Sequence, residues 1–540
     1  MGRMDINGSP TVTMEINGFK GINNATQFSQ IDIRQSPKML NLLPGKVGGL
    51  RNRDGTRPLT FFPTPGLKRM GRLRKNQSTT IVAAANTTLY EYLSNSWTPA
   101  FMNVFLDSPD IDTVQFRDSS ANEVLIITDG GGLKYYDGIS VSLVPPAPND
   151  PSPNPVNDLP NINTNNPPVG ITTHNNRLVI WPNNKDIIFH SRPGYYDYFP
   201  ANAFQRFVND NDTIQTCISF GSSLLVFMRR CIGVLFGDGY LGTDQDWYQD
   251  FLDTTDGCVN GRSVQIVVFP NGEERVFYQT DKGVSAVYNV DTKSLDNSTR
   301  LATVSMTDTK IDWNALGITK AEWMGAVSYF YQGRYWLIYK QGTTYQGLVY
   351  DTTSNEWFPV NNIDANDFYG GTIDSDTSDD YLWFITEAGH LKRFQDFPAI
   401  GVANYDYQDI NLLTGTPVQW EWYSKLMNPQ ITGFDHFWDI LMIEAQQFEY
   451  DSVINVEVNT FNDRFTQLRA VKTEIMIVNV SVIGQAQIGN DNLTDIINNA
   501  KRIRAFVKGQ YAQVRLWNDD GMPAEVFDIR FEVRPQTAYG

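Results

Sequence analysis

Cysteine and histidine are both scarce in this chain of 540 residues. The three cysteines (Cys217, Cys231 and Cys258) form no CxxC pair and are too few for a disulfide framework, so we expect buried free thiols. No two of the four histidines lie at the spacing of metal ligands, and the HExxH, GxSxG, P-loop and Rossmann patterns are absent. The sequence therefore predicts no cofactor, no metal centre and no nucleotide- or zinc-dependent enzyme.

Long apolar runs are missing as well. No stretch reaches the roughly 18 consecutive apolar residues that a membrane-spanning helix needs. The first 30 residues lack the continuous apolar core of a secretory signal. We therefore expect no membrane span and no secretory signal, and synthesis in a cytoplasm.

Acidic residues outnumber basic ones, but the excess is uneven. The net charge is −17, yet residues 1–75 hold 13 Lys and Arg against 4 Asp and Glu, whereas the remaining 465 residues hold 30 against 56. The basic segment either docks onto the acidic body of its own chain or attaches to an acidic partner or nucleic acid. The candidate partner-binding residues are Lys68, Arg69, Arg72, Arg74 and Lys75.

Turn-forming and aromatic residues are abundant, with 41 Gly, 27 Pro and 13% aromatics, which is typical of an all-β protein. The clearest unit is Gly333–Val360. There an apolar run from Tyr335 to Tyr339 meets a polar turn, and a second run follows at Leu348–Tyr350. Short aromatic and β-branched runs between turn residues predict a β-hairpin.

The same pattern recurs along the chain. Apolar runs start 43 to 59 residues apart, near Ile81, Val124, Leu178, Leu225, Val276, Tyr335 and Leu382. A degenerate repeat of about 40–50 residues is typical of the four-stranded blade of a β-propeller. We predict about seven blades, with six or eight also possible. A long β-sandwich built from ordinary hairpins is the alternative.

The predicted organisation has three parts: an extended N-terminal arm at 1–69, an irregular β-propeller at 70–398 and a C-terminal β-sandwich-like domain at 399–540. Closely spaced glycines leave no room for a stable helix in the arm. Nine prolines at 145–168 predict a stiff surface excursion between blades. In the C-terminal domain, one short helix is expected at Leu493–Ile503.

The most acidic tract, 364–380, has two interpretations. Clustered carboxylates could hold calcium, but the spacing of an EF-hand loop is missing, so a solvated turn is the alternative. The residues concerned are Asp374, Asp376, Asp379 and Asp380.

Three stretches of the chain resemble a known protein family. The opening NGFKGINN, followed by LLPGKVGGLRNRDGTRPL, is similar to the start of the packaged-DNA stabilisation and tail-nozzle (tail tubular) proteins of tailed bacteriophages. The closing segments at Trp420–Gln430, Phe437–Gln446 and Lys508–Pro535 look like the final strands of that family. The resemblance implies a structural virion protein, not an enzyme, in the tail nozzle or head–tail connector around the DNA exit channel.

The resemblance also implies partners and a location. The chain would form a ring, a homo-hexamer by analogy, and would contact portal, adaptor or other tail proteins, with tail fibres also possible. It would assemble in the host cytoplasm and help to retain and deliver packaged DNA during ejection. The charge split adds a prediction about the channel: the acidic face lines the lumen and repels phosphates, while the basic arm points to a neighbouring protein, so genomic DNA would pass without sequence-specific binding.

Two other functions fit the same composition. A glycan- or receptor-binding propeller, or a glycoside hydrolase, needs only exposed aromatics or a pair of carboxylates, although the Asp-box repeat of sialidases is absent. A propeller acting only as an interaction platform is the other candidate, without regular WD or kelch signatures.

Overall fold

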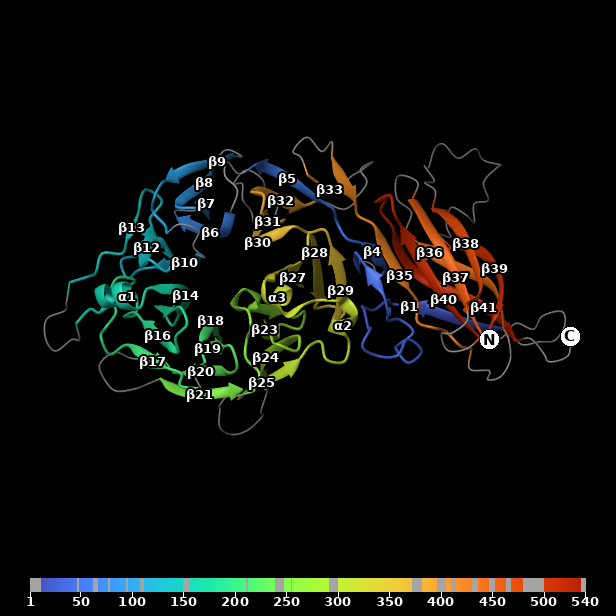
Figure 1. Cartoon of the computed structure of the whole chain (residues 1–540), viewed down its shortest axis with the longest axis horizontal. Coiled ribbons are helices and arrows are strands. Elements are labelled where there is room, and N and C mark those ends of the chain that lie inside the picture. Colours follow the sequence, from blue (N-terminus) through green and yellow to red (C-terminus); the bar gives the residue numbers. More distant parts are fainter. Residues whose placement is uncertain are drawn as a thin grey trace.

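The computed structural model describes eighteen ranges of the chain. They are 11–45, 48–61, 67–75, 78–93, 96–106, 111–148, 156–209, 212–237, 247–253, 255–290, 300–371, 381–395, 405–408, 414–429, 436–445, 452–462, 468–478 and 500–535. Within these ranges the chain forms a ring of blades joined to a second β domain (Figure 1).

Six blades are sheets of four antiparallel strands in chain order. Blade 1 contains β6 (Leu67–Lys75), β7 (Ser78–Ala85), β8 (Thr88–Leu93) and β9 (Ser96–Phe101). Blade 2 contains β10 (Asp112–Arg117), β11 (Glu123–Thr128), β12 (Leu133–Tyr136) and β13 (Val141–Leu143). Blade 3 contains β14 (Pro168–His174), β15 (Arg177–Pro182), β16 (Ile187–His190) and β17 (Phe204–Arg206). Blade 4 contains β18 (Ile214–Phe220), β19 (Ser223–Met228), β20 (Ile232–Phe236) and β21 (Tyr248–Asp253). Blade 5 contains β22 (Gln265–Val268), β23 (Glu274–Gln279), β24 (Val284–Val290) and β25 (Arg300–Ser305). Blade 6 contains β26 (Val327–Tyr331), β27 (Arg334–Gln341), β28 (Thr344–Asp351) and β29 (Glu356–Asn361).

The seventh blade closes the ring with a strand from the N-terminal arm. Its sheet runs β30 (Ala365–Gly371), β31 (Tyr381–Thr386), β32 (His390–Phe394) and β5 (Thr56–Phe61), and continues into β33 (Tyr405–Tyr407) and β34 (Gly415–Pro417). β5 pairs antiparallel with β32, from Thr56 opposite Phe394 to Phe61 opposite His390. Strands far apart in the sequence thus complete one blade, and the predicted fold class is confirmed, with seven blades in the described ranges.

The recurring apolar runs form the second strand of each blade. All side chains of β15 and β19 are buried, because both faces of these strands are covered by neighbouring blades. The first strands of the blades lie side by side around the ring axis, which makes them the wall of the central channel.

The second domain is a β-sandwich of two sheets that share strands from both ends of the chain. One sheet contains β3 (Leu42–Pro44), β4 (Leu50–Asn52), β41 (Glu525–Pro535), β36 (His436–Ala445) and β39 (Ala500–Gly509), with β1 (Val12–Asn17) also paired to β41. The other contains β2 (Met39–Leu40), β35 (Trp420–Tyr423), β40 (Tyr511–Asn518), β37 (Ser452–Phe461) and β38 (Leu468–Val478). In β40 burial alternates strictly, as expected for a strand with one face in a core.

The arm therefore clips onto its own chain. Its attachment surface is the sandwich, which receives β1 to β4, and blade 7, which receives β5. Figure 1 shows the arm running between the two domains. The predicted boundary at 399 also shifts, because β33 and β34 still belong to the sheet of blade 7 and the sandwich strands begin at β35.

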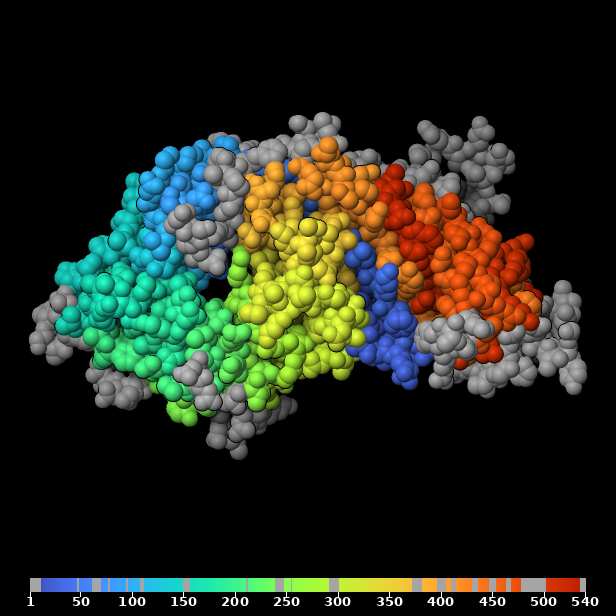
Figure 2. Space-filling view, in the orientation of Figure 1, coloured from blue at the N-terminus to red at the C-terminus, as the bar shows by residue number. Residues whose placement is uncertain are grey.

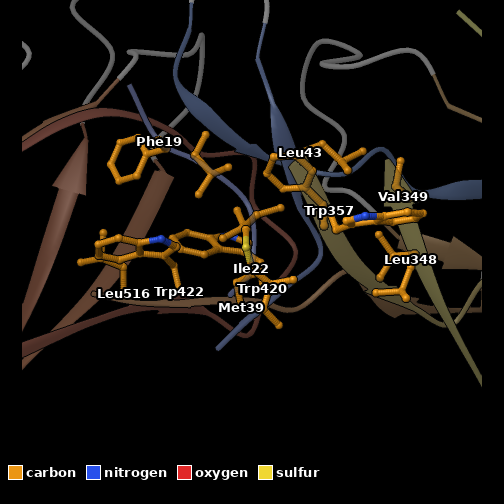
Figure 3. Packing of buried hydrophobic residues seen from close by; sticks show 14 of the residues in the cluster. Phe19, Ile22, Met39, Leu43, Leu348, Val349, Trp357, Trp420, Trp422 and Leu516 are labelled. Atoms are coloured by element: carbon orange, nitrogen blue, oxygen red, sulfur yellow. The ribbon is translucent and has the colours of Figure 1, made fainter. Parts of the chain in front are cut away.

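One continuous hydrophobic core joins the two domains through the arm (Figure 3). Phe19 packs edge-on against Trp422 of the sandwich at 5.3 Å between ring centroids. The backbone N–H of Ile22 donates to the carbonyl of Trp357 in blade 6 at 2.8 Å. Gly21 permits this approach, because a Cβ there would lie 2.2 Å from the same oxygen.

A buried ion pair fixes the arm where it enters the propeller. The guanidinium of Arg53 donates to both oxygens of Asp406 at 3.0 and 2.5 Å, and both side chains are at most 1% exposed. Its remaining donors reach Asn41 Oδ1 and the carbonyls of Asp54 and Asn361. Because every donor has an acceptor, the pair satisfies the condition for burying charge.

Helices are few and short in the described ranges. They are α1 (Leu159–Asn165), α2 (Trp313–Leu316), α3 (Lys320–Met324) and the 3-10 turn η1 (Gly261–Ser263). α1 lies in the Pro-rich segment, so the extended excursion expected there is wrong for these residues; residues 149–155 are outside the described ranges. Pro160 sits in the first turn, where its missing N–H costs nothing, and Leu159 and Ile162 are buried between blades 2 and 3.

The helix expected at Leu493–Ile503 is wrong at its C-terminal end. Residues 500–503 belong to β39, which pairs with β36 from Glu444 opposite Ala500 to His436 opposite Gly509. Residues 493–499 lie outside the described ranges. The apolar side chains at 500 and 503 that suggested a helical face belong instead to a strand.

Candidate functional site

The five candidate partner-binding residues all lie on β6, the channel-lining strand of blade 1. The side chain of Lys68 is outside the described residues. Arg72 and Arg74 are exposed on one face of the strand, two residues apart. Lys75 donates through Nζ to the carbonyl of Asp137 in blade 2 at 2.9 Å.

Arg72 affects blade 6 electrostatically. Burial raises the pKa of Tyr329, on the first strand of blade 6, and the positive charge of Arg72 opposes that shift. Arg72 thus lies near the channel wall formed by another blade. The backbone of Arg74 is held by blade 2, because its N–H donates to Gln115 Oε1 and its carbonyl accepts from Gln115 Nε2.

Arg69 joins three blades at the other end of β6. Its guanidinium contacts Asp112 of blade 2 at 3.1 Å and donates to the carbonyl of Ile111 at 3.3 Å. The second oxygen of Asp112 accepts the backbone N–H of Ile171 in blade 3 at 3.2 Å. This carboxylate therefore links blades 1, 2 and 3 at the channel wall.

A second carboxylate links blade 7, which closes the ring, to other blades. Asp367 of blade 7 accepts the N–H of Met70 in blade 1 at 3.0 Å and lies 3.5 Å from the guanidinium of Arg262. Arg262, in the turn η1 that leads into blade 5, also donates to the carbonyl of Asn366 at 2.7 Å. The closing point of the ring is thus bridged by an arginine from blade 5.

These groups surround a cavity of about 440 Å³ at the mouth of the channel. Its wall includes Arg69, Arg262, Asp112 and Asp129. Asp129 is already bonded, because it accepts from Lys134 at 2.5 Å and from the backbone N–H of Gly131. Figure 2 shows a hollow at the centre of the ring beside blade 1. The mouth is polar and its opposite charges are paired across blades.

Cations of the basic segment pair with acids elsewhere in the chain, both at the channel wall and away from it. Lys38 contacts Glu421 at 2.7 Å, in addition to the Arg53–Asp406 and Arg69–Asp112 pairs. Docking of the basic segment onto its own chain is therefore realised for these three residues. Binding of a partner by the five β6 residues stays a prediction.

The acidic tract lies mostly outside the described residues. Asp374, Asp376, Asp379 and Asp380 fall in 372–380, so the structure says nothing about calcium there. Asp364 is described and holds the buried ammonium of Lys392 at 2.8 and 3.0 Å. Among the described residues no group of three His, Cys, Asp or Glu side chains has a metal-binding arrangement.

The comparisons with known proteins show no family for this chain. No family model matches the chain, and no curated protein matches it. Solved structures with a similar fold include the WD40 domain of SCAP from fission yeast, with 7% identity over 63% of this chain and 98% of that one and a TM-score of 0.34. Another is the β-propeller domain of Cps50 (Swd1) from Myceliophteria thermophila, with 8% identity over 64% and 99% and a TM-score of 0.37. Likeness at this level carries no information on function.

Several residues at the channel mouth escaped sequence analysis. Asp112, Arg262 and Asp367 are isolated charges among ordinary turn residues, and no local pattern marks them. Only the ring geometry brings them together. In the described part of the chain, no helix is long and apolar enough to cross a membrane.

Proposed function

We propose that this chain is a structural protein of a tailed-bacteriophage virion, part of the tail nozzle or head–tail connector around the DNA exit channel. The observation that carries the proposal is the resemblance of its arm motifs to that family. In the structure these motif residues have architectural roles, since Gly21 contacts Trp357, Arg53 pairs with Asp406 and the next strand is β5. A motif that joins two domains is expected in a protein whose function depends on its shape.

The geometry supports a role in transmitting force between the two domains. The ring is closed by β5, which directly follows the sandwich strand β4, so pulling the two domains apart would have to separate either β5 from β32 or β1 and β4 from β41. Antiparallel pairing and a shared core resist such separation collectively. A connector that transmits force during DNA ejection needs this kind of union.

The proposed partners are further copies of the chain in a hexameric ring, the portal, an adaptor or other tail proteins, and tail fibres. The exposed Arg72 and Arg74, with Lys75, remain the proposed contact with an acidic neighbour. Genomic DNA is proposed to pass the acidic body of the assembly without being held, because outside residues 1–75 acidic residues outnumber basic ones by 56 to 30 and a negative surface repels phosphates.

The proposal is tested by the protein content of purified virions and by the position of this chain on the particle. Mass spectrometry of particles whose genome encodes this chain should find it in multiple copies, and negative-stain images labelled with antibody should place it on the tail. Absence of the chain from such particles would refute the proposal. Release of reducing sugar by the isolated protein would favour the glycoside hydrolase instead.

A further inference from the structure

A second cavity lies between the arm and the propeller and has no part in the channel. Its volume is about 810 Å³, within the range of small-ligand sites. We call it the junction groove. One wall comes from the arm, with Phe19, Pro44 and Arg51, and the other from turns of blades 6 and 7, including Tyr331 and Tyr381. The groove therefore exists only while the arm is docked.

One half-buried tyrosine of the blade wall is held in a fixed position. Tyr331 packs against Gly370, where a Cβ would lie 2.7 Å from the ring. Tyr381, the other tyrosine of the lining, packs its ring toward blade 1, where the guanidinium of Arg393 lies 3.7 Å from the ring centroid and Trp383 meets it edge-on at 5.8 Å. Tyr331 is therefore the aromatic ring that the wall offers at little further cost in entropy on binding.

The charges of the groove are balanced. Arg334 lies 3.3 Å from Asp351, and Arg51 lies 3.4 Å from Asp54. The described lining thus holds two guanidinium groups and two carboxylates. Because the charges cancel in close pairs, the groove offers no net attraction to an ion of either sign.

Neutral polar groups complete the wall. Asp351 accepts from the backbone N–H groups of Thr353 and Ser354 at 3.0 and 2.9 Å, which fixes the turn that lines the groove. The amides of Gln332 and Gln395 also line it. Amides and hydroxyls both donate and accept hydrogen bonds.

We propose that the junction groove binds a short neutral oligosaccharide. A pyranose ring has an apolar face of C–H groups, which suits a fixed aromatic ring, and a rim of hydroxyls, each able to donate and accept. Paired charges and amides supply partners for such hydroxyls without favouring a charged sugar. This inference rests on the groove and not on the proposed virion role.

The test uses the full chain and saturation-transfer NMR with a panel of malto-, cello- and chito-oligosaccharides, together with acidic uronic-acid oligosaccharides. The decisive variant is Thr353→Trp, because Thr353 is exposed in the lining and a larger side chain fills the groove without removing core contacts. The matched control is Thr343→Trp, an exposed turn position at the opposite end of blade 6.

At least one neutral oligosaccharide should bind the native chain and the control, and binding should be lost in Thr353→Trp. Tyr331→Ala should weaken it roughly tenfold or more, as loss of an aromatic contact does. Lack of binding by every neutral member, binding that survives Thr353→Trp, or preference for the acidic sugars would each overturn the proposal. Since none of these outcomes depends on virions, failure here leaves the tail proposal standing.

Discussion

The buried pair of Arg53 and Asp406 should control whether the ring stays closed. Replacing Arg53 by Met keeps most of the side-chain volume but leaves the Asp406 carboxylate with Thr56 Oγ1 as its hydrogen-bond donor within the described ranges, at 3.1 Å. Removing one member of a buried pair costs about 3–5 kcal/mol, because the other charge is left desolvated and unpaired. Arg53 also loses its bonds to Asn41 and two carbonyls, so the upper part of that range is expected.

Hydrogen exchange measures this cost locally. A loss of about 3–5 kcal/mol raises the population of the open state about 10²–10⁴-fold, since each 1.4 kcal/mol is a factor of ten. We expect faster exchange in β5 and β32, with blades 3 and 4 unchanged. Local exchange is a better assay than a global melting curve, because a chain of two domains need not unfold in one step.

The control is Arg34→Met in the same arm. Arg34 pairs with Asp32 at 2.8 Å, but its side chain is 42% exposed, and exposed pairs contribute about 1 kcal/mol or less. Exchange in β5 should therefore stay within a few-fold of the native chain. If Arg53→Met behaved like Arg34→Met, the argument that this pair holds the ring closed would be refuted.

Three further predictions follow from particular residues. Gly21→Ala should destabilise arm docking by about 1–3 kcal/mol, because its Cβ would meet the carbonyl of Trp357. Gly325→Ala should not, because the atom nearest to its Cβ would be 3.6 Å away. The rate of proteolysis of the arm reports the difference. Burial lowers the pKa of His190 to about 3, so the folded protein loses stability as the pH falls from about 6.5 toward 3. His190→Phe keeps the stacking on Trp247 and should show a smaller drop in unfolding midpoint between pH 7 and pH 5. An equal drop in the variant would contradict the lowered pKa of His190. Replacing Arg72, Arg74 and Lys75 by Ser, while leaving Arg69 with Asp112, should impair particle assembly but not folding, and normal assembly would rule out a contact role for these residues.

The features that could be predicted from the sequence, the apolar strands and the blade repeat, are encoded by residues close together in the chain. The runs at Ile81, Leu178 and Leu225 are the buried second strands of their blades, and their continuous apolar character follows from packing on both faces. The repeat length of about 50 residues then indicated the blade. These signals need only neighbours in the chain.

The features that could not be predicted depend on pairing between strands far apart in the sequence. β1 pairs with β41, so Val12 lies opposite Val533, and nothing in the glycine-broken arm indicates that partner. Ring closure by β5 is equally invisible, because any exposed edge of matching length would satisfy the strand. In the Pro-rich segment, the prolines outweighed the i, i+3 spacing of Leu159 and Ile162, which is the signal that would have indicated α1.

The most direct test of the proposed function is an electron cryomicroscopy map of the tail of virions whose genome encodes this chain. We predict density for the seven-bladed propeller and its sandwich repeated around the exit channel, with sixfold symmetry and the exposed end of β6 facing a neighbouring protein. A tail map that accounts for all its protein density without this chain would contradict the proposal.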